Sequence, residues 1–299
     1  RGLLCQRVDV KYDFIRQQRK AYPVTVLCSV MEVSRSGYYQ YIKTGHAMKI
    51  DKDFRLLSEV RQIHGETRGS YGSRRVSERL RLRGYLVGRY RARSLMKKAG
   101  VSVKHRKKFR ITTDSKHNFP VAPNLLDRNF QVEQTDAVWC SDITYLWTME
   151  GWLYLAVIID LFSRKVVGWA MSHRMKASLV TEALSMAYWR RKPAKGLIHH
   201  SDRGSQYAGG DYQKLLGTYG MICSMSRKGD CWDNAVAESF FHSLKTEWTS
   251  GMLYRSRNDA RSDVIHYIEM FYNSHRLHSS LDYKNPNEYE KNFMMAKTA

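Results

Sequence analysis

Three long apolar segments follow one another closely in the middle of the chain. They are "AVWCSDITYLWT" at 137–148, "WLYLAVIIDLFS" at 152–163 and "KVVGWAMS" at 165–172. Their length and their short connections predict three neighbouring antiparallel strands, because a parallel crossover needs a dozen or more residues. No other feature constrains the fold as strongly.

Helices and two shorter strands alternate after this unit. Apolar residues at helical spacing predict helices at 177–191, 211–220, 234–248 and 258–275, and "GLIHHS" (196–201) and "MICSMS" (221–226) predict the fourth and fifth strands. Three antiparallel strands followed by alternating helices and strands predict an α/β fold. We expect a mixed five-stranded sheet with helices on both faces.

The chain before residue 124 predicts helices only. We expect a helical module at 1–48, a helix-turn-helix domain at 49–104, a basic linker at 105–123 and the sheet-containing domain at 124–299. In the second part, two apolar helical cores flank a break between two glycines, and a basic helix at about 89–99 suits DNA recognition. A three-helix packing module without DNA contact is the alternative.

Two local patterns in the helical part predict particular side-chain positions. Phe54, Leu57, Val60 and Ile63 are spaced for one buried helical face. Ser34 or Ser36 is placed to cap a following helix.

Positive charge is concentrated in the N-terminal part. The net charge is +22, and residues 1–120 hold 29 Lys/Arg against 9 Asp/Glu, whereas residues 121–299 hold 21 against 19. Such a surplus favours a polyanion whose counterions are released on binding, and nucleic acid is the leading candidate. A solvated basic surface or an anionic-membrane patch is the alternative.

Other compositional features exclude several classes. No run approaches about 18 apolar residues and no secretory leader opens the chain, which favours a cytoplasmic protein without membrane contact. The five cysteines are odd in number and form no C-x-x-C pair, so we expect reduced packing residues rather than disulfides or a zinc site.

Three acidic residues are placed to converge. Asp142 lies in the middle of the first strand, and Asp202 ends the fourth strand, which neighbours the first in such a sheet. On the helix that follows, Glu238 and Lys245 share one edge of the buried stripe, whereas Glu247 points away. Three carboxylates suit Mg²⁺ or Mn²⁺, and two such ions support in-line phosphoryl transfer.

Competing interpretations exist for several polar residues. Asp202 could instead cap a turn, and Asp160 could be a fourth acid, although a turn-capping role is favoured for it. For His199 and His200 we favour core packing over metal binding, at least for one of them. Further expectations are an N-cap role for Asp233, base stacking or loop anchoring by Trp232, and phosphate contact by Arg276.

The motifs taken together resemble a known family. The blocks "WCSDITY", "IIDLFSRKVVGW", "HHSDRGSQY", "DNAVAESFFHSLKTE" and "NSHRLHSSLDYKNPNEY" resemble the insertion-sequence transposases of the IS-three family, whose catalytic half is similar to retroviral integrase. The 35 residues between Asp202 and Glu238, with Lys245 seven further on, match that family's pattern. The resemblance implies a ribonuclease-H-like fold in which Asp142, Asp202 and Glu238 are the catalytic and metal-binding residues.

The resemblance also implies a reaction and its partners. Water cleaves one strand at a transposon end, the freed 3′-hydroxyl attacks a second phosphodiester, and a circular intermediate inserts into target DNA. The implied partners are the terminal inverted repeats, target DNA, a second copy of the chain and the OrfA product of an upstream reading frame, at the nucleoid in a bacterial cytoplasm. The alternatives are a ribonuclease-H-like nuclease and a DNA-binding regulator.

Basic residues in three regions are expected to contact DNA. They are Arg203, Arg227, Lys228 and Lys245 near the acids, Arg74, Arg75, Arg89, Arg91, Arg93, Lys97 and Lys98 in the helix-turn-helix, and Lys107 and Lys108 in the linker.

Overall fold

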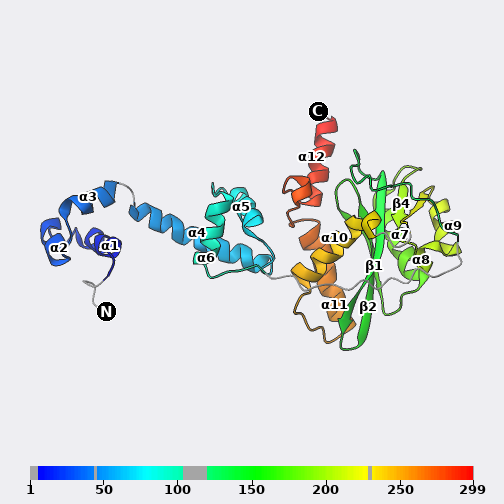
Figure 1. Ribbon diagram of the computed structural model, residues 1–299, viewed down its shortest axis with the longest axis horizontal. Coiled ribbons are helices and arrows are strands. Elements are labelled where there is room, and N and C mark those ends of the chain that lie inside the picture. Colours follow the sequence, from blue (N-terminus) through cyan, green and yellow to red (C-terminus); the bar gives the residue numbers. More distant parts are fainter. Residues whose placement is uncertain (1–5, 44–45, 104–119, 228–230, 299) are drawn as a thin grey trace. The chain divides into compact units, whose positions relative to one another are not determined.

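The computed structural model describes residues 6–43, 46–103, 120–227 and 231–298. The chain forms two compact units, Arg1–Val103 and Lys104–Ala299 (Figure 1). No helix among these residues has the length and apolar character needed to cross a membrane.

The first unit begins with three short helices. These are α1 (Val8–Gln18), α2 (Val24–Val30) and α3 (Arg35–Lys43). Ile15, Leu27 and Tyr38 form part of their common buried core. The hydroxyl of Ser34 accepts a hydrogen bond from the Gly37 backbone N–H (3.0 Å), so the predicted cap at Ser34 is confirmed.

The helix-turn-helix follows in the same unit. Its helices are α4 (His46–Glu66), α5 (Ser73–Leu82) and α6 (Arg89–Lys98), and the predicted core residues Val76, Leu80, Leu95 and Met96 are all buried. The buried Ser77 hydroxyl donates to the Val87 carbonyl at 2.6 Å, and this bond fixes the turn between α5 and α6.

The predicted buried face of α4 is partly wrong. Val60 and Ile63 are fully buried, but the side chain of Phe54 is 72% exposed and Leu56 is buried instead. Three residues turn the helix by about 300°, which is about 60° short of a full turn. Over the three steps from Phe54 to Ile63 this shortfall adds up to about 180°, so the two residues lie on opposite sides of the helix. The spacing of Leu56, Val60 and Ile63 stays on one face.

The second unit contains the predicted five-stranded sheet. Its strands are β1 (Val138–Thr148), β2 (Gly151–Asp160), β3 (Val166–Ser172), β4 (Ile198–Ser201) and β5 (Ile222–Met225), in the order β3-β2-β1-β4-β5. The first three pair antiparallel, and β4 is parallel to both β1 and β5. Every strand predicted from the sequence is confirmed.

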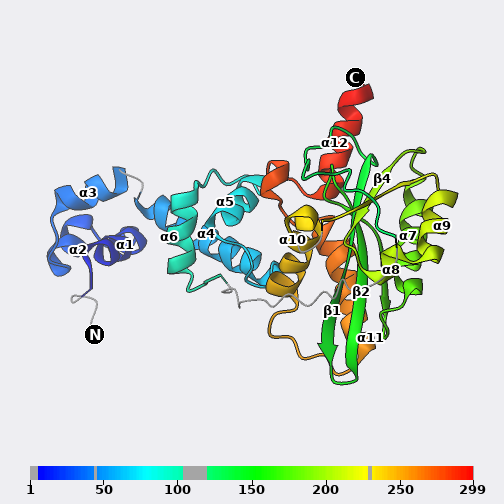
Figure 2. The same ribbon diagram turned by 45° about the vertical axis from the view of Figure 1, so that its right-hand side comes forward.

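Helices cover both faces of this sheet (Figure 2). One face carries α7 (Ala177–Arg191), the short α8 (Ser205–Ala208) and α9 (Gly210–Thr218), and the other carries α10 (Ala235–Ser243) and α11 (Arg257–Ile265). Gly168 lets α7 approach β3, because a Cβ there would lie 2.4 Å from the Ala183 carbonyl oxygen. The helix α12 (Pro286–Thr298) and the short α8 were not predicted.

The helices predicted at 234–248 and 258–275 are not uniform α-helices. Each changes to π-helical turns, at Leu244–Trp248 and at His266–Tyr272. The wider i→i+5 bonds are made by the N–H groups of Thr249 and Asn273, which donate to Leu244 and Ile268 at 3.0 and 3.1 Å.

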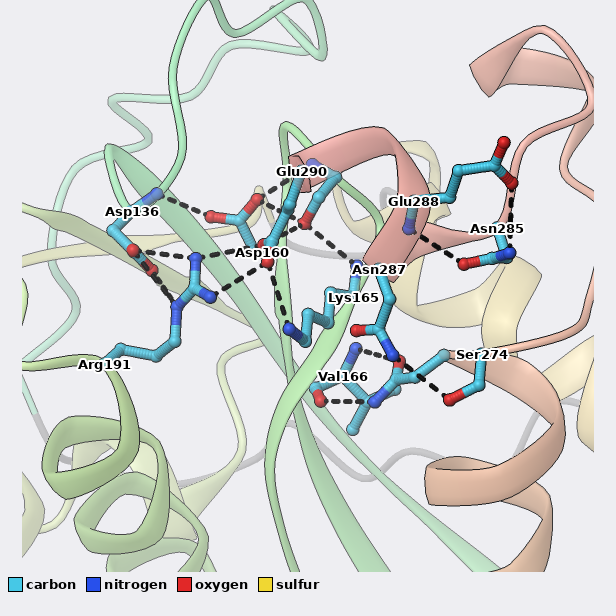
Figure 3. A network of polar contacts seen from close by, with 12 residues as sticks. Asp136, Asp160, Lys165, Val166, Arg191, Ser274, Asn285, Asn287, Glu288 and Glu290 are labelled. Carbon is cyan, nitrogen blue, oxygen red and sulfur yellow. Dashed lines mark hydrogen bonds and ion pairs between the residues drawn. The ribbon is translucent and has the colours of Figure 1, made fainter. Parts of the chain in front are cut away.

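A buried polar network ties α12 to the sheet (Figure 3). Glu290 on α12 receives two hydrogen bonds from Arg191 at 3.0 Å each, and one from Lys165 at 3.0 Å. The Ser163 hydroxyl contacts both Glu290 and Asp160 at 2.8 Å. Asp160 also accepts from the Ser163 backbone N–H, which confirms the favoured turn-capping role.

Candidate active site

Asp142 lies in the middle of β1, opposite Val157 of β2. Its Oδ1 accepts a hydrogen bond from the Ile143 backbone N–H at 2.8 Å. Burial first, and then the negative charges of Asp202 and Glu238, raise the pKa of Asp142 well above its usual value. The two other predicted acids therefore lie close enough to act on this carboxyl group.

The sheet register explains how Asp202 comes near Asp142. Val138 of β1 pairs with Ile198 of β4, and Cys140 pairs with His200. Asp142 and Asp202 each follow this last pair by two residues, so they also lie next to each other. The short β4 thus ends beside the middle of β1, which brings the two carboxylates together, as the strand order predicted.

Asp202 also organises the turn that follows it. Its Oδ1 accepts from the Gly204 backbone N–H at 2.9 Å, and a Cβ at Gly204 would lie only 3.0 Å from that oxygen. The glycine therefore permits the close approach, and α8 begins directly afterwards. The turn role considered for Asp202 is confirmed, and it does not compete with the position beside Asp142.

Glu238 lies in the first turn of α10 and is exposed, with its pKa raised by partial burial. The predicted stripe beside it is buried, as shown by Ala237, Phe241 and Leu244. The buried Asn234 side chain donates to the Ser141 carbonyl oxygen at 3.1 Å. This bond joins the start of α10 to β1, one residue before Asp142.

Lys245 supplies positive charge beside the acids. Burial lowers its pKa to about 8, against the opposing charge of Asp142. Its Nζ lies 4.8 Å from the centre of the Tyr145 ring. The ammonium group therefore lies beside the Tyr145 ring and within electrostatic reach of Asp142, both on β1.

The donor set fits a hard divalent cation, although it is not preassembled as a cage. Within the described ranges, no three His, Cys, Asp or Glu side chains are already gathered tightly enough to hold a metal ion. Burial first, and then repulsion by the charges of Asp202 and Glu238, instead raises the pKa of Asp142. A divalent cation would relieve that repulsion, and oxygen-only ligands suit Mg²⁺ rather than zinc.

The two histidines before Asp202 are core residues. Both are fully buried, and burial lowers the pKa of His199 to about 3 and that of His200 to about 4. The Tyr212 hydroxyl lies 3.0 Å from His199 Nε2, and His200 Nδ1 lies 2.9 Å from the Ser224 hydroxyl. These contacts confirm core packing for both.

Asp233 does not cap α10, contrary to our expectation. Its buried carboxylate accepts from Arg227 at 2.8, 2.9 and 3.1 Å, from Arg128 Nε at 3.1 Å and from Asn124 at 2.9 Å. These hydrogen bonds, led by those from the Arg227 side chain, hold the pKa of Asp233 far below its usual value. The cluster ties residues 124–128 to the segment before α10.

The basic residues of the second unit that were predicted to contact DNA differ in their surroundings. Arg227 donates hydrogen bonds to Asp233, and Arg203 Nε donates to the Ser226 carbonyl at 2.6 Å. Arg276 is buried against Glu247 at 2.7 Å, so its predicted phosphate contact is wrong. Lys107, Lys108, Lys228 and the side chain of Trp232 lie outside the residues that the structure describes.

Most of the predicted contacts of the first unit are at its surface. Arg91 and Lys98 pair with Asp53 at 2.5 and 3.3 Å, and the Arg75 guanidinium lies 5.4 Å from the Tyr71 ring centre. The remaining members are exposed: Arg74, Arg89, Arg93 and Lys97.

Sequence reasoning missed two features of the site. Nothing marked Asn234 as the residue that joins α10 to β1, although it directly precedes the helix. The aromatic partner of Lys245 was also missed, because a ring at Tyr145 has the pattern of any strand residue.

Family models match most of the chain. A model described as an integrase core domain matches residues 132–231, a second of the same description matches 219–286, and an HTH-like domain model matches 51–109.

Individual proteins match over nearly their whole length. The "Insertion element IS600 uncharacterized 31 kDa protein" of Shigella sonnei is 44% identical, over 89% of this chain and 98% of that protein. "Transposase InsF for insertion sequence IS3A" of Escherichia coli (strain K12) is 40% identical, over 94% of this chain and 98% of that protein. Among solved structures, the catalytic core domain of BIV integrase aligns with 55% of this chain and 99% of its own, at 17% identity and a TM-score of 0.41.

Proposed function

Because the chain belongs to the insertion-sequence transposases of the IS-three family, we propose that it cleaves a DNA strand at a transposon end and transfers the resulting 3′-hydroxyl to a second phosphodiester. The same attack of a 3′-hydroxyl on a phosphodiester would integrate the element into target DNA. One arrangement carries the proposal: β4, which ends directly before Asp202, pairs with β1 beside Asp142, and the Asn234–Ser141 hydrogen bond joins the start of α10, which bears Glu238, to the same part of β1.

Each carboxylate has a role in this proposal. Asp142, Asp202 and Glu238 would hold the metal, and backbone hydrogen bonds from Ile143 and Gly204 at 2.8 and 2.9 Å fix Asp142 and Asp202. A pair of Mg²⁺ ions, for which Mn²⁺ can substitute, would stabilise the attacking and leaving oxygens of an in-line displacement. Lys245 would bind a phosphate next to Asp142 through its ammonium group.

The remaining parts of the chain supply DNA binding. We propose that the helix-turn-helix at 49–104 binds the terminal inverted repeats through the exposed Arg89, Arg93 and Lys97, together with the module at 1–48 and the linker at 105–123. The domain at 124–299 acts on the bound ends. A dimer on DNA, help from the OrfA product and a place at the bacterial nucleoid belong to the same proposal.

A strand-joining assay tests the function. The full chain is incubated with labelled DNA of the insertion-sequence end and Mg²⁺, and joined strands are the expected product. Degradation without joining would identify a nuclease, and retardation without chemistry would identify a regulator. Either result overturns the proposal.

Three substitutions test the site. D142N, D202N and E238Q should each abolish joining while DNA retardation is retained. D211N, at an exposed carboxylate on α9, is the matched control and should join strands like the wild type. Joining by E238Q at the wild-type rate would remove Glu238 from the site.

A further inference from the structure

An exposed aromatic surface lies along β1 and β2 beyond Asp142, on the other face of the sheet from that carboxylate. The antiparallel register pairs Tyr145 with Tyr154 and Trp147 with Trp152, so these side chains share one face of the sheet. Trp147 is 56% and Trp152 is 42% exposed, whereas Leu146, Leu153 and other residues of the opposite face are buried. Figure 2 shows the two strands extending past the others, with α11 beside them. We name Tyr145, Trp147 and Trp152 the aromatic ladder.

The rings of the ladder hold one another in place. Trp152 meets Tyr145 edge to face at 4.9 Å and 79°, and it meets Trp147 at 4.7 Å and 74°. Arg257 of α11 fixes the backbone of the β1–β2 hairpin, because its guanidinium group donates to the carbonyl oxygens of Glu150 and Trp152. Large apolar ring faces are thus presented to solvent in a fixed arrangement.

Lys245 connects the ladder to the acids. Its Nζ lies 4.8 Å from the Tyr145 ring centre, and its charge acts on Asp142. A phosphate attracted to this ammonium group would place the adjoining nucleotide over the rings. The ammonium group of Lys245 is followed by the rings of the ladder, and along a DNA strand a phosphate is likewise followed by a base.

We propose that the aromatic ladder stacks an unpaired base of the DNA strand whose phosphate lies at Lys245. This deepens the proposed transposase function and rests on it. The charge of Lys245 favours DNA over a second copy of the chain, since an apolar protein contact would have to desolvate that charge.

Base stacking can be measured without chemistry, in EDTA. The probe is a forked duplex with 2-aminopurine at successive positions of one single-stranded arm, bound by the full chain. Quenching at one or two positions is expected, and W147L or W152L should remove it and weaken binding about 10-fold. Replacing the quenched base by an abasic site should weaken wild-type binding by the same factor as the leucine substitutions do. The leucine variants should bind the abasic DNA no more weakly than they bind the intact DNA. M149A, at the exposed hairpin tip, is the control and should bind like the wild type.

Conservative variants and sedimentation separate the outcomes. W147F and W152F should retain most of the quenching, which a merely misfolded hairpin would not allow. Quenching and affinity unchanged in the leucine variants would overturn the proposal. The proposal would also be overturned if the leucine variants lost dimers in sedimentation while their DNA affinity did not depend on the presence of the base. That result would assign the ladder to contact with a second copy of the chain. E238Q should still quench, so failure of strand joining and failure of stacking are distinguishable.

Discussion

The side chain of Asn234 donates a hydrogen bond to the backbone carbonyl of Ser141 at 3.1 Å, and both residues are buried. Asn234 directly precedes α10, which carries Glu238, and Ser141 directly precedes Asp142 on β1. One hydrogen bond therefore fixes the position of the helical acid relative to the strand acid.

Replacing Asn234 should impair joining more than folding. N234A removes the donor, and we expect a loss of about 1–3 kcal/mol in the free energy of unfolding. The joining rate should fall at least 10-fold, because small displacements of reacting groups are costly. N258A, at an exposed position of α11, is the control for both measurements. Wild-type joining by N234A would show that other contacts place α10.

Magnesium should stabilise the second unit. After burial, the charges of Asp202 and Glu238 raise the pKa of Asp142, and a bound cation would compensate these charges. Ligand binding to the folded state adds about 2.7 kcal/mol at a concentration of 100 Kd. All 7 tryptophans lie after residue 124, so the tryptophan fluorescence melting curve reports this unit alone. EDTA should reverse the increase in Tm, and D202N and E238Q should each reduce it. An equal increase in D142N would place the metal elsewhere.

Asp160 should give a pH dependence to the stability of this unit. Burial raises the pKa of Asp160 to about 6, against hydrogen bonds from Ser163 and from the Asp136 backbone N–H. The folded state thus holds this proton more tightly than the unfolded state, where the pKa is about 4. The resulting stabilisation is fully present below about pH 4 and is lost as the pH rises through about 6, an effect of about 3 kcal/mol.

The difference between wild type and D160N isolates this effect. Urea unfolding followed by tryptophan fluorescence from pH 4 to 7 should show the wild type losing stability relative to D160N as the pH rises. D211N serves as the matched carboxylate control. A difference between wild type and D160N that is constant over this range would contradict the assignment.

Two glycines should respond in opposite directions to alanine. At Gly168 a Cβ would lie 2.4 Å from the Ala183 carbonyl oxygen and 2.7 Å from the Ala187 Cβ, so G168A must displace α7 and cost about 1–3 kcal/mol. At the exposed Gly217 on α9 a Cβ meets nothing within 4 Å, and G217A should stabilise the unit by about 0.5–1 kcal/mol. Tryptophan fluorescence during urea unfolding measures both. A neutral G168A would show that α7 adjusts without cost.

The sequence by itself determined the features that depend on local periodicity. Alternation and length predicted all five strands, and helical spacing predicted the core of the helix-turn-helix and the buried stripe beside Glu238. The order of the strands then predicted that Asp142 and Asp202 converge, because the strand that leads to Asp202 lies next to the strand that carries Asp142.

Only the tertiary structure decided which polar groups meet across long separations. The sequence gives no periodic signal for the pairing of Glu290 with Arg191, of Asp233 with Arg128 or of Arg276 with Glu247. Each buried charge takes whichever partner the folded chain brings within reach, since leaving it unpaired would be costly. For the same reason Asp233 and Arg276 took structural partners where their sequence neighbours had suggested a helix cap and a DNA contact.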